Sequence, residues 1–213
     1  MSAKSTKKPT TTFQKLEQIV YPLQGVGQIL DIMEIPFKGE NVLYYVIYIP
    51  VSDMTVKIPV DRAEGLGIRA IVPPEESEKA LQLFSEEFEP IPADWKMRYQ
   101  INLDLLKQGS IHDIASVVRT LYQRKKVKEL PIMERKLYDS ALQLLVDEVS
   151  FSLGISTDEV EEMVFSKLEA GAGPGKGAGG SALEPDLQDD DEQLTETPAP
   201  ADDADEDDDD DDE

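Results

Sequence analysis

The chain has 213 residues and a formal net charge of −23, and it contains no cysteine and one histidine. The lack of cysteine excludes disulfide bonds, thiolate nucleophiles and cysteine-ligated metal sites, and we expect His112 to be a solvated surface residue rather than a base or ligand. No run of about 18 apolar residues is present, and the polar start is unlike a secretory signal, so we expect a cytoplasmic protein with no membrane contact.

The negative charge is concentrated at the C-terminal end. Residues 1–170 carry 20 Lys and Arg against 26 Asp and Glu, whereas residues 171–213 carry one Lys and 18 acidic residues. The last segment is rich in Gly and Ala and then in Asp, so it lacks the apolar surface whose burial would offset the entropy of ordering it. We therefore expect residues 170–213 to be a disordered linker and acidic tail, and residues 1–12 to be a disordered N-terminus.

The sequence of residues 13–72, which follow the polar N-terminus, predicts a small β-rich domain. Two short strands within residues 13–32 flank a sharp bend, residues 35–41 predict a second turn, and a further short strand is expected near Gly67. Four or five short strands in about sixty residues are typical of a small, strongly bent sheet or barrel.

A β-hairpin at residues 42–60 lies at the centre of this domain. Its first half is an unbroken apolar run, which indicates a strand buried on both faces. Its second half alternates from Met54 onward, so that Thr55 and Lys57 face outward. Pro59 has no backbone N–H and suits an edge strand. An edge strand with a polar outer face is a place where another protein adds a strand of its own.

Residues 73–169 predict a compact helical bundle, which makes the whole chain an α+β protein. The paired prolines Pro73 and Pro74 mark the boundary, and short links between the helices favour close packing. Several helix starts and stops carry a capping signal. The predicted helices are residues 75–84, 95–108, 111–126, 132–153 and 157–168, with capping or stop residues at Asp94, Gly109, Ser110, Gly154 and Ser156.

The helical part holds the candidate nucleic-acid surface. Residues 95–136 carry ten Lys and Arg and four acidic residues, which indicates either a solvated helix face or a phosphate-contacting patch. Trp95, the single tryptophan, begins a stripe with Tyr99, Leu103 and Leu106 that is typical of a helical core. At an exposed helix start beside lysine, the same tryptophan suits a wedge in the DNA minor groove. The pattern leaves both readings of Trp95 open.

Several motifs together resemble the CarD/CdnL family of bacterial transcription regulators, whose N-terminal module is shared with the transcription-repair coupling factor. The likeness covers residues 13–168, and the two halves match in the right order. The matching motifs are Val20-Tyr21-Pro22, Gly25-Val26-Gly27, Tyr44-Tyr45-Val46, residues 53–60, Ala63-Glu64, Gly67-Ile68-Arg69, residues 95–99, Asn102-Leu103 and residues 117–121.

The resemblance implies a Tudor-like or SH3-like N-terminal domain that binds the β subunit of RNA polymerase, and a helical domain that contacts promoter DNA at the upstream edge of the transcription bubble. The tryptophan that matches Trp95 would wedge into the minor groove and keep the opened duplex from closing. Lys57 matches a basic residue that faces acidic groups on the polymerase. The chain departs from the pattern at Ile35, Met97 and Gln100, where some relatives carry basic residues.

On this basis the chain is predicted to be a monomeric, non-enzymatic regulator that stabilises the open promoter complex, needs no cofactor or metal, and localises to the nucleoid with RNA polymerase. One alternative is a protein–protein adaptor that uses the β module without DNA, and another is a chaperone-like protein that acts through its acidic tail. The predicted polymerase-binding residues are Ile35, Thr55, Val56 and Lys57, and the predicted DNA-binding residues are Trp95, Lys96, Arg98, Arg119, Arg124, Lys125 and Lys126.

The acidic tail carries a prediction of its own. A polyanion on the same chain competes with DNA phosphate for basic side chains, and added salt weakens the competition. Removal of residues 171–213 is therefore expected to tighten binding to forked promoter DNA at low salt, with a gain that shrinks at high salt. Equal affinities of the full-length and truncated proteins at low salt would leave the tail as a solubility device.

Overall fold

A computed structural model of the protein describes residues 11–86 and 91–171. An antiparallel sheet forms its N-terminal part. The strand order within the described residues is β4-β3-β2-β1-β5, so β4 and β5 are the two edge strands. This five-stranded sheet confirms the predicted β-rich fold. The strands are β1 (Gln18–Tyr21), β2 (Gly25–Phe37), β3 (Glu40–Ile49), β4 (Met54–Pro59) and β5 (Arg69–Ala70).

Strand β4 of the β3–β4 hairpin has the predicted alternation. Tyr45 pairs with Ile58 on the face that builds the sheet core, and the neighbouring pair, Val46 with Lys57, points to the opposite face. The side chain of Tyr45 is fully buried, and its hydroxyl accepts a hydrogen bond of 3.1 Å from the backbone N–H of Phe13. The N-terminal segment is thereby anchored across one face of the sheet.

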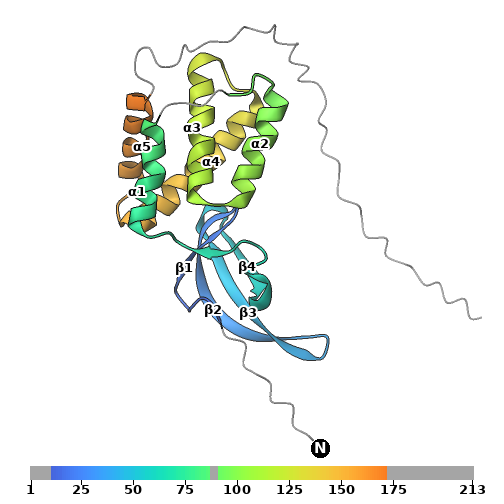
Figure 1. The fold of residues 1–213 in the computed structure, drawn as a ribbon. Coiled ribbons are helices and arrows are strands. Elements are labelled where there is room, and N and C mark those ends of the chain that lie inside the picture. Colours follow the sequence, from blue (N-terminus) through green and yellow to red (C-terminus); the bar gives the residue numbers. More distant parts are fainter. Residues whose placement is uncertain (1–10, 87–90, 172–213) are drawn as a thin grey trace, which may run out of the picture. The chain divides into compact units, whose positions relative to one another are not determined.

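The predicted turn at residues 35–41 is too wide. Strand β2 runs to Phe37 and β3 begins at Glu40, so that only Lys38 and Gly39 form the turn. Both residues have positive φ angles, 50° and 85°, as a type I′ two-residue hairpin turn requires. Pro36 is paired within the ladder, opposite Asn41. The result is the long, bent β2–β3 ribbon in Figure 1.

The C-terminal half is helical, and the helix ends that carry the predicted capping residues lie where the sequence predicts them. Asp94 accepts a hydrogen bond from the backbone N–H of Lys96, Ser110 accepts one from Asp113, and Gly109 and Gly154 end their helices in left-handed conformations. The last helix continues to Gly171, three residues beyond its predicted end. The helices are α1 (Pro74–Gln82), α2 (Trp95–Gln108), α3 (Ile111–Val127), α4 (Ile132–Leu153) and α5 (Thr157–Gly171).

The helices pack around a single large apolar cluster in which Phe84, Leu121, Leu145 and Leu168 are at most about 1% exposed. Helices α2 and α3 form a hairpin, so the start of α2 and the end of α3 lie at the same end of this pair (Figure 1). Apart from residues 11–12 and 170–171, the predicted disordered N-terminus and acidic tail lie outside the described residues.

Candidate functional site

The first candidate surface is the free edge of strand β4. β4 pairs with β3 on one side, and no strand of the described part pairs with its other side. Thr55 and Lys57 are exposed on the face opposite the sheet core, whereas Val56 is half-buried and packs against that core. Of the three predicted contacts on β4, the side chains of Thr55 and Lys57 therefore share a face, and Val56 belongs to the other.

Ile35 lies on the same face as Lys57 but not beside it. Ile35 pairs with Val42, which is four residues along β3 from Val46, the partner of Lys57. At about 3.3 Å per residue, the row that contains Ile35 and Val42 lies about 13 Å from the row that contains Lys57 and Val46. Sequence reasoning missed Tyr44, which is half-buried on this face between the two rows. The unbroken apolar run of β3 hid the alternation that would have assigned Tyr44 to it.

The second candidate surface lies at one end of the helical part. We define the bundle end as the first turns of α2 and α4 and the last turn of α3. Trp95 begins α2 and is half-buried, and the Lys96 ammonium lies 5.7 Å from the centroid of its ring. Leu106 is buried, and Tyr99 and Leu103 pack against the core cluster, but Trp95 does not belong to that cluster. The core interpretation therefore fits three members of the stripe, and Trp95 is partly accessible.

Arg98 does not fit its predicted role. The guanidinium is 2% exposed, and it donates to both carboxylate oxygens of Glu134, at 2.6 and 2.7 Å. Its remaining nitrogen donates to the carbonyl oxygens of Pro92 and Ala93. A guanidinium whose three nitrogens are all engaged below the surface does not reach a DNA phosphate, so the assignment of Arg98 to the DNA-binding set is corrected. Arg98 instead fixes the first turn of α2 against α4.

This buried ion pair yields a stability prediction. Glu134→Ala leaves the Arg98 guanidinium buried without its counter-charge, and breaking such a pair costs about 3–5 kcal/mol. For a chain of this size we expect the melting temperature to fall by about 6–20 °C. Glu129→Ala is the matched control, because Glu129 is 82% exposed in its pair with Arg135 and should contribute about 1 kcal/mol or less. Equal melting curves for the two variants would contradict the structural role of Arg98.

The last turn of α3 carries three predicted DNA contacts, and its cations also suit the negative end of the helix dipole. The Lys125 ammonium lies 5.2 Å from the centroid of the Tyr138 ring. Lys126 lies 2.5 Å from a carboxylate oxygen of Glu169 on α5. The third, Arg124, is half-buried, and its Nε has no hydrogen-bond partner within the described residues. Two exposed lysines therefore border the bundle end, and one of them is partly neutralised.

Neighbouring charges and burial shift the pKa values of several side chains in this region. The Lys126 ammonium and the Tyr122 hydroxyl hold the pKa of the Glu169 carboxyl below its usual value. Burial raises the pKa of Tyr122, and burial raises the pKa of Tyr138 to about 12. These tyrosines are therefore neutral at physiological pH, and Glu169 stays charged beside Lys126.

Arg119 lies apart from the bundle end. It is two turns before the end of α3, and its guanidinium donates to the carbonyl oxygen of Glu86 at 3.2 Å. Arg119 lines a groove of about 390 Å³ between α2 and α3, together with Leu105 and Thr120. Of the predicted DNA-binding set, Trp95, Lys96, Arg124, Lys125 and Lys126 thus lie at the bundle end, Arg98 is buried within it, and Arg119 lies outside it.

The structure adds exposed apolar residues at the bundle end that sequence reasoning missed. Val127 is 78% exposed, Met97 57% and Ile132 56%. Val127 stands between lysines in the sequence Lys125-Lys126-Val127-Lys128, and that interruption of a basic run is the signal that could have drawn attention to it. Partly accessible apolar side chains interleaved with lysines can contact both the sugars or bases and the phosphates of a nucleic acid.

Two further classes of site find no support in the described part of the chain. No group of three or more His, Asp or Glu side chains is arranged there to hold a metal ion. None of the helices there is long and apolar enough to cross a membrane.

Comparison with known proteins matches both halves of the chain. Residues 13–72 match the family described as "CarD-like/TRCF RID domain", and residues 79–165 match "CarD, C-terminal domain". A Bacillus subtilis (strain 168) protein named "Putative transcription factor YdeB" is 36% identical over 149 residues, which are 70% of this chain and 97% of that protein.

Proposed function

The chain belongs to the CarD family of transcription regulators, and on this premise we propose that it binds the β subunit of RNA polymerase and stabilises the open promoter complex. The observation that carries the proposal is the pairing of two surfaces on one chain: a free strand edge with an exposed lysine, and a helix start with a partly accessible tryptophan among lysines. We assign residues 13–72 to the polymerase contact and residues 73–169 to the DNA contact.

The polymerase contact is proposed to extend the sheet at β4. A strand of the partner that pairs with β4 gains backbone hydrogen bonds, and side chains on the outer face supply specificity. Lys57 and Thr55 lie on that face at the edge itself. An acidic group on the partner strand would meet the Lys57 ammonium and form a charge-assisted contact.

The DNA contact is proposed to lie at the bundle end. Trp95 would insert against a base step at the fork, where the duplex is already weakened, and the lysines would contact the flanking phosphates. The residues assigned to these roles are Trp95, Lys96, Lys125 and Lys126, with Val127 and Ile132 as additional apolar contacts. Phosphate and wedge contacts carry little base-specific information, so we expect binding with little dependence on sequence.

A binding assay with separated partners tests this assignment. Purified full-length protein is expected to capture the isolated polymerase β subunit without DNA, and to bind forked DNA without polymerase. Binding to the fork should weaken with salt, with a slope on a logarithmic plot that reflects the few phosphates contacted. Capture of the β subunit with no affinity for forked DNA at low salt would support the adaptor alternative and remove the DNA half of the proposal.

A further inference from the structure

We propose that Arg69 and Glu148 act as positioning residues that hold the β-sheet and the helices in one arrangement. Through this junction they set where Trp95 stands relative to the β4 edge. The geometric part of this inference is independent of the proposed function, and its consequence for promoter opening rests on that function.

The junction is a bidentate, partly buried ion pair between residues 79 positions apart in the chain. The Arg69 guanidinium on β5 donates to both carboxylate oxygens of Glu148 on α4, at 2.5 and 2.8 Å. Glu148 is 1% exposed and Arg69 is 27% exposed. The same carboxylate accepts a hydrogen bond of 3.3 Å from the backbone N–H of Val72. One side chain of the bundle thus holds both edge strand β5 and the segment that follows it.

The guanidinium also holds the end of α2. Its Nε and one terminal nitrogen donate to the carbonyl oxygen of Gly109, at 3.0 and 2.7 Å. Gly109 ends α2 with a φ of 73°, and a Cβ at this position would lie 3.3 Å from Pro22 in the β1–β2 turn. Four segments therefore meet at one point: β5, the β1–β2 turn, the end of α2, and α4.

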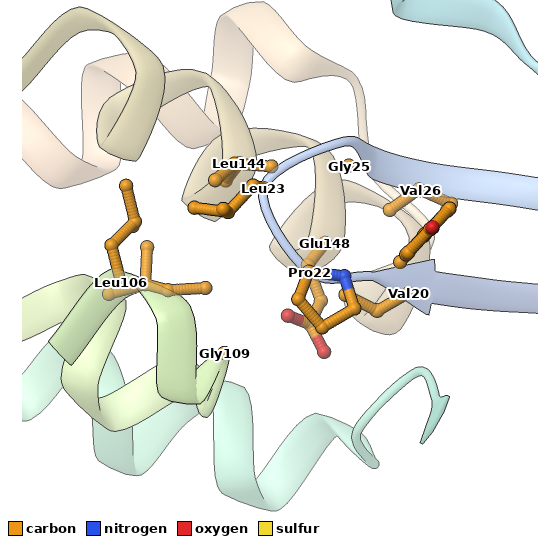
Figure 2. A pocket seen from close by; sticks show the side chains of 11 residues that line it. Val20, Pro22, Leu23, Gly25, Val26, Leu106, Gly109, Leu144 and Glu148 are labelled. Carbon is orange, nitrogen blue, oxygen red and sulfur yellow. The ribbon is translucent and has the colours of Figure 1, made fainter. Parts of the chain in front are cut away.

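The rest of the junction is apolar and small. Figure 2 shows Val20 and Val26 of the sheet on one side of a pocket and Leu106 and Leu144 of the helices on the other, with the Glu148 carboxylate beside Pro22. The cavity among them is only about 10 Å³, so these side chains are in close contact. Small interfaces within one chain usually permit relative motion of the parts, and the ion pair adds directional constraints that apolar contact does not supply.

The constraint matters because α2 is fixed within the bundle by the Arg98–Glu134 pair, so any rotation of the bundle at the junction also moves Trp95. Arg69 holds the C-terminal end of α2, and Trp95 is the first residue at its other end. A helix of 14 residues is about 21 Å long, so a rotation of the bundle by about 10° about the junction at the C-terminal end of α2 displaces Trp95 by about 4 Å. Such a displacement exceeds the separation of successive base pairs, which is about 3.4 Å. A loose junction would therefore spread Trp95 over more than one base step.

Two labels on a chain without cysteine measure the constraint directly. We would place spin labels at Glu40→Cys on the sheet and Glu161→Cys on α5, both exposed positions outside the proposed contacts. Pulsed electron–electron double resonance then gives the distribution of distances between the two labels. The test variant is Arg69→Met with Glu148→Met, because removing both charges avoids a buried, unpaired carboxylate. The control is Lys79→Met with Glu76→Met, an exposed pair on α1.

We expect a narrow distribution in the parent and in the control, and a distribution at least twice as broad in the test variant, with an unchanged circular dichroism spectrum. Arg69→Lys, which keeps the charge but loses the planar fork, should give an intermediate width. A test variant that stays folded and keeps the narrow distribution would overturn the inference. If the test variant unfolds, Arg69→Lys provides the test instead. A distance distribution in Arg69→Lys as narrow as that of the parent would contradict the positioning role.

The functional consequence is a loss of coupling rather than of binding. The unlabelled test variant is expected to bind the isolated β subunit and forked DNA within about twofold of the parent. It should nevertheless shorten the lifetime of the full open complex by about tenfold or more, because simultaneous binding through two surfaces depends on their spacing. A proportional fall in all three measurements would assign the pair to folding alone. If the parent itself binds neither partner, the proposed function fails. The distances between the labels still test whether Arg69 and Glu148 hold the sheet and the helices in one arrangement.

Discussion

Trp95→Ala is expected to shorten the lifetime of the open promoter complex by about 5- to 150-fold, which corresponds to the 1–3 kcal/mol that stacking of an aromatic side chain on a base contributes. Binding to the polymerase β subunit should not change, because Trp95 lies on α2 and the strand edge is formed by β4. The measurement is the decay of preformed complexes after addition of a competitor, with parent and variant compared on one promoter.

Thermal melting separates this effect from a loss of folding. Trp95 is half-buried and outside the apolar cluster of the helices, so Trp95→Ala should cost much less than the 3–5 kcal/mol typical of a buried tryptophan. Trp95→Phe retains a ring and is expected to restore part of the lifetime. A large drop in melting temperature together with an unchanged complex lifetime would show that Trp95 is a core residue after all.

Lys57→Glu is expected to weaken binding to the isolated β subunit by about 10- to 150-fold. A hydrogen bond to a charged group contributes about 1.5–3 kcal/mol, and reversal of the charge adds repulsion to its loss. Lys57 is exposed and makes no part of the sheet core, so the variant should melt as the parent does. The affinity is measured by titration of the β subunit, without DNA.

The matched control for Lys57 is Lys107→Glu. Lys107 is 52% exposed on the last turn of α2, so its reversal changes the net charge equally and leaves the β4 edge intact. If both variants lose the same affinity, the effect belongs to the overall charge. If Lys57→Glu binds as tightly as the parent, β4 is not the polymerase contact.

The fold was largely predictable because the residues that begin and end its helices and strands act through local interactions. Asp94 and Ser110 each accept a backbone hydrogen bond within three residues, and Gly109 supplies the left-handed residue that ends α2. These interactions depend only on neighbouring residues, so the sequence pattern is sufficient to place them. The edge strand β4 was predictable for a similar reason, since its alternation and Pro59 are both local signals.

The site was less predictable because its decisive contacts are long-range. Nothing near Arg98 in the sequence shows that Glu134, 36 residues later, removes it from the surface. Glu148 and Arg69 are further apart still, and in the sequence Arg69 stands out only as part of a motif. A count of basic residues therefore overestimates the DNA-facing set, because it does not distinguish a guanidinium that binds a phosphate from one that braces two helices.

The central claim is that the two surfaces act together on one promoter, and the lifetime of the open complex tests it most directly. Polymerase and promoter DNA are allowed to form open complexes with and without the full-length protein, and the decay is followed after a competitor is added. The account predicts that the protein lengthens the lifetime, that Lys57→Glu and Trp95→Ala each remove most of the gain, and that combining them removes little more. A lifetime that the parent protein leaves unchanged, although it binds the β subunit, would contradict the account.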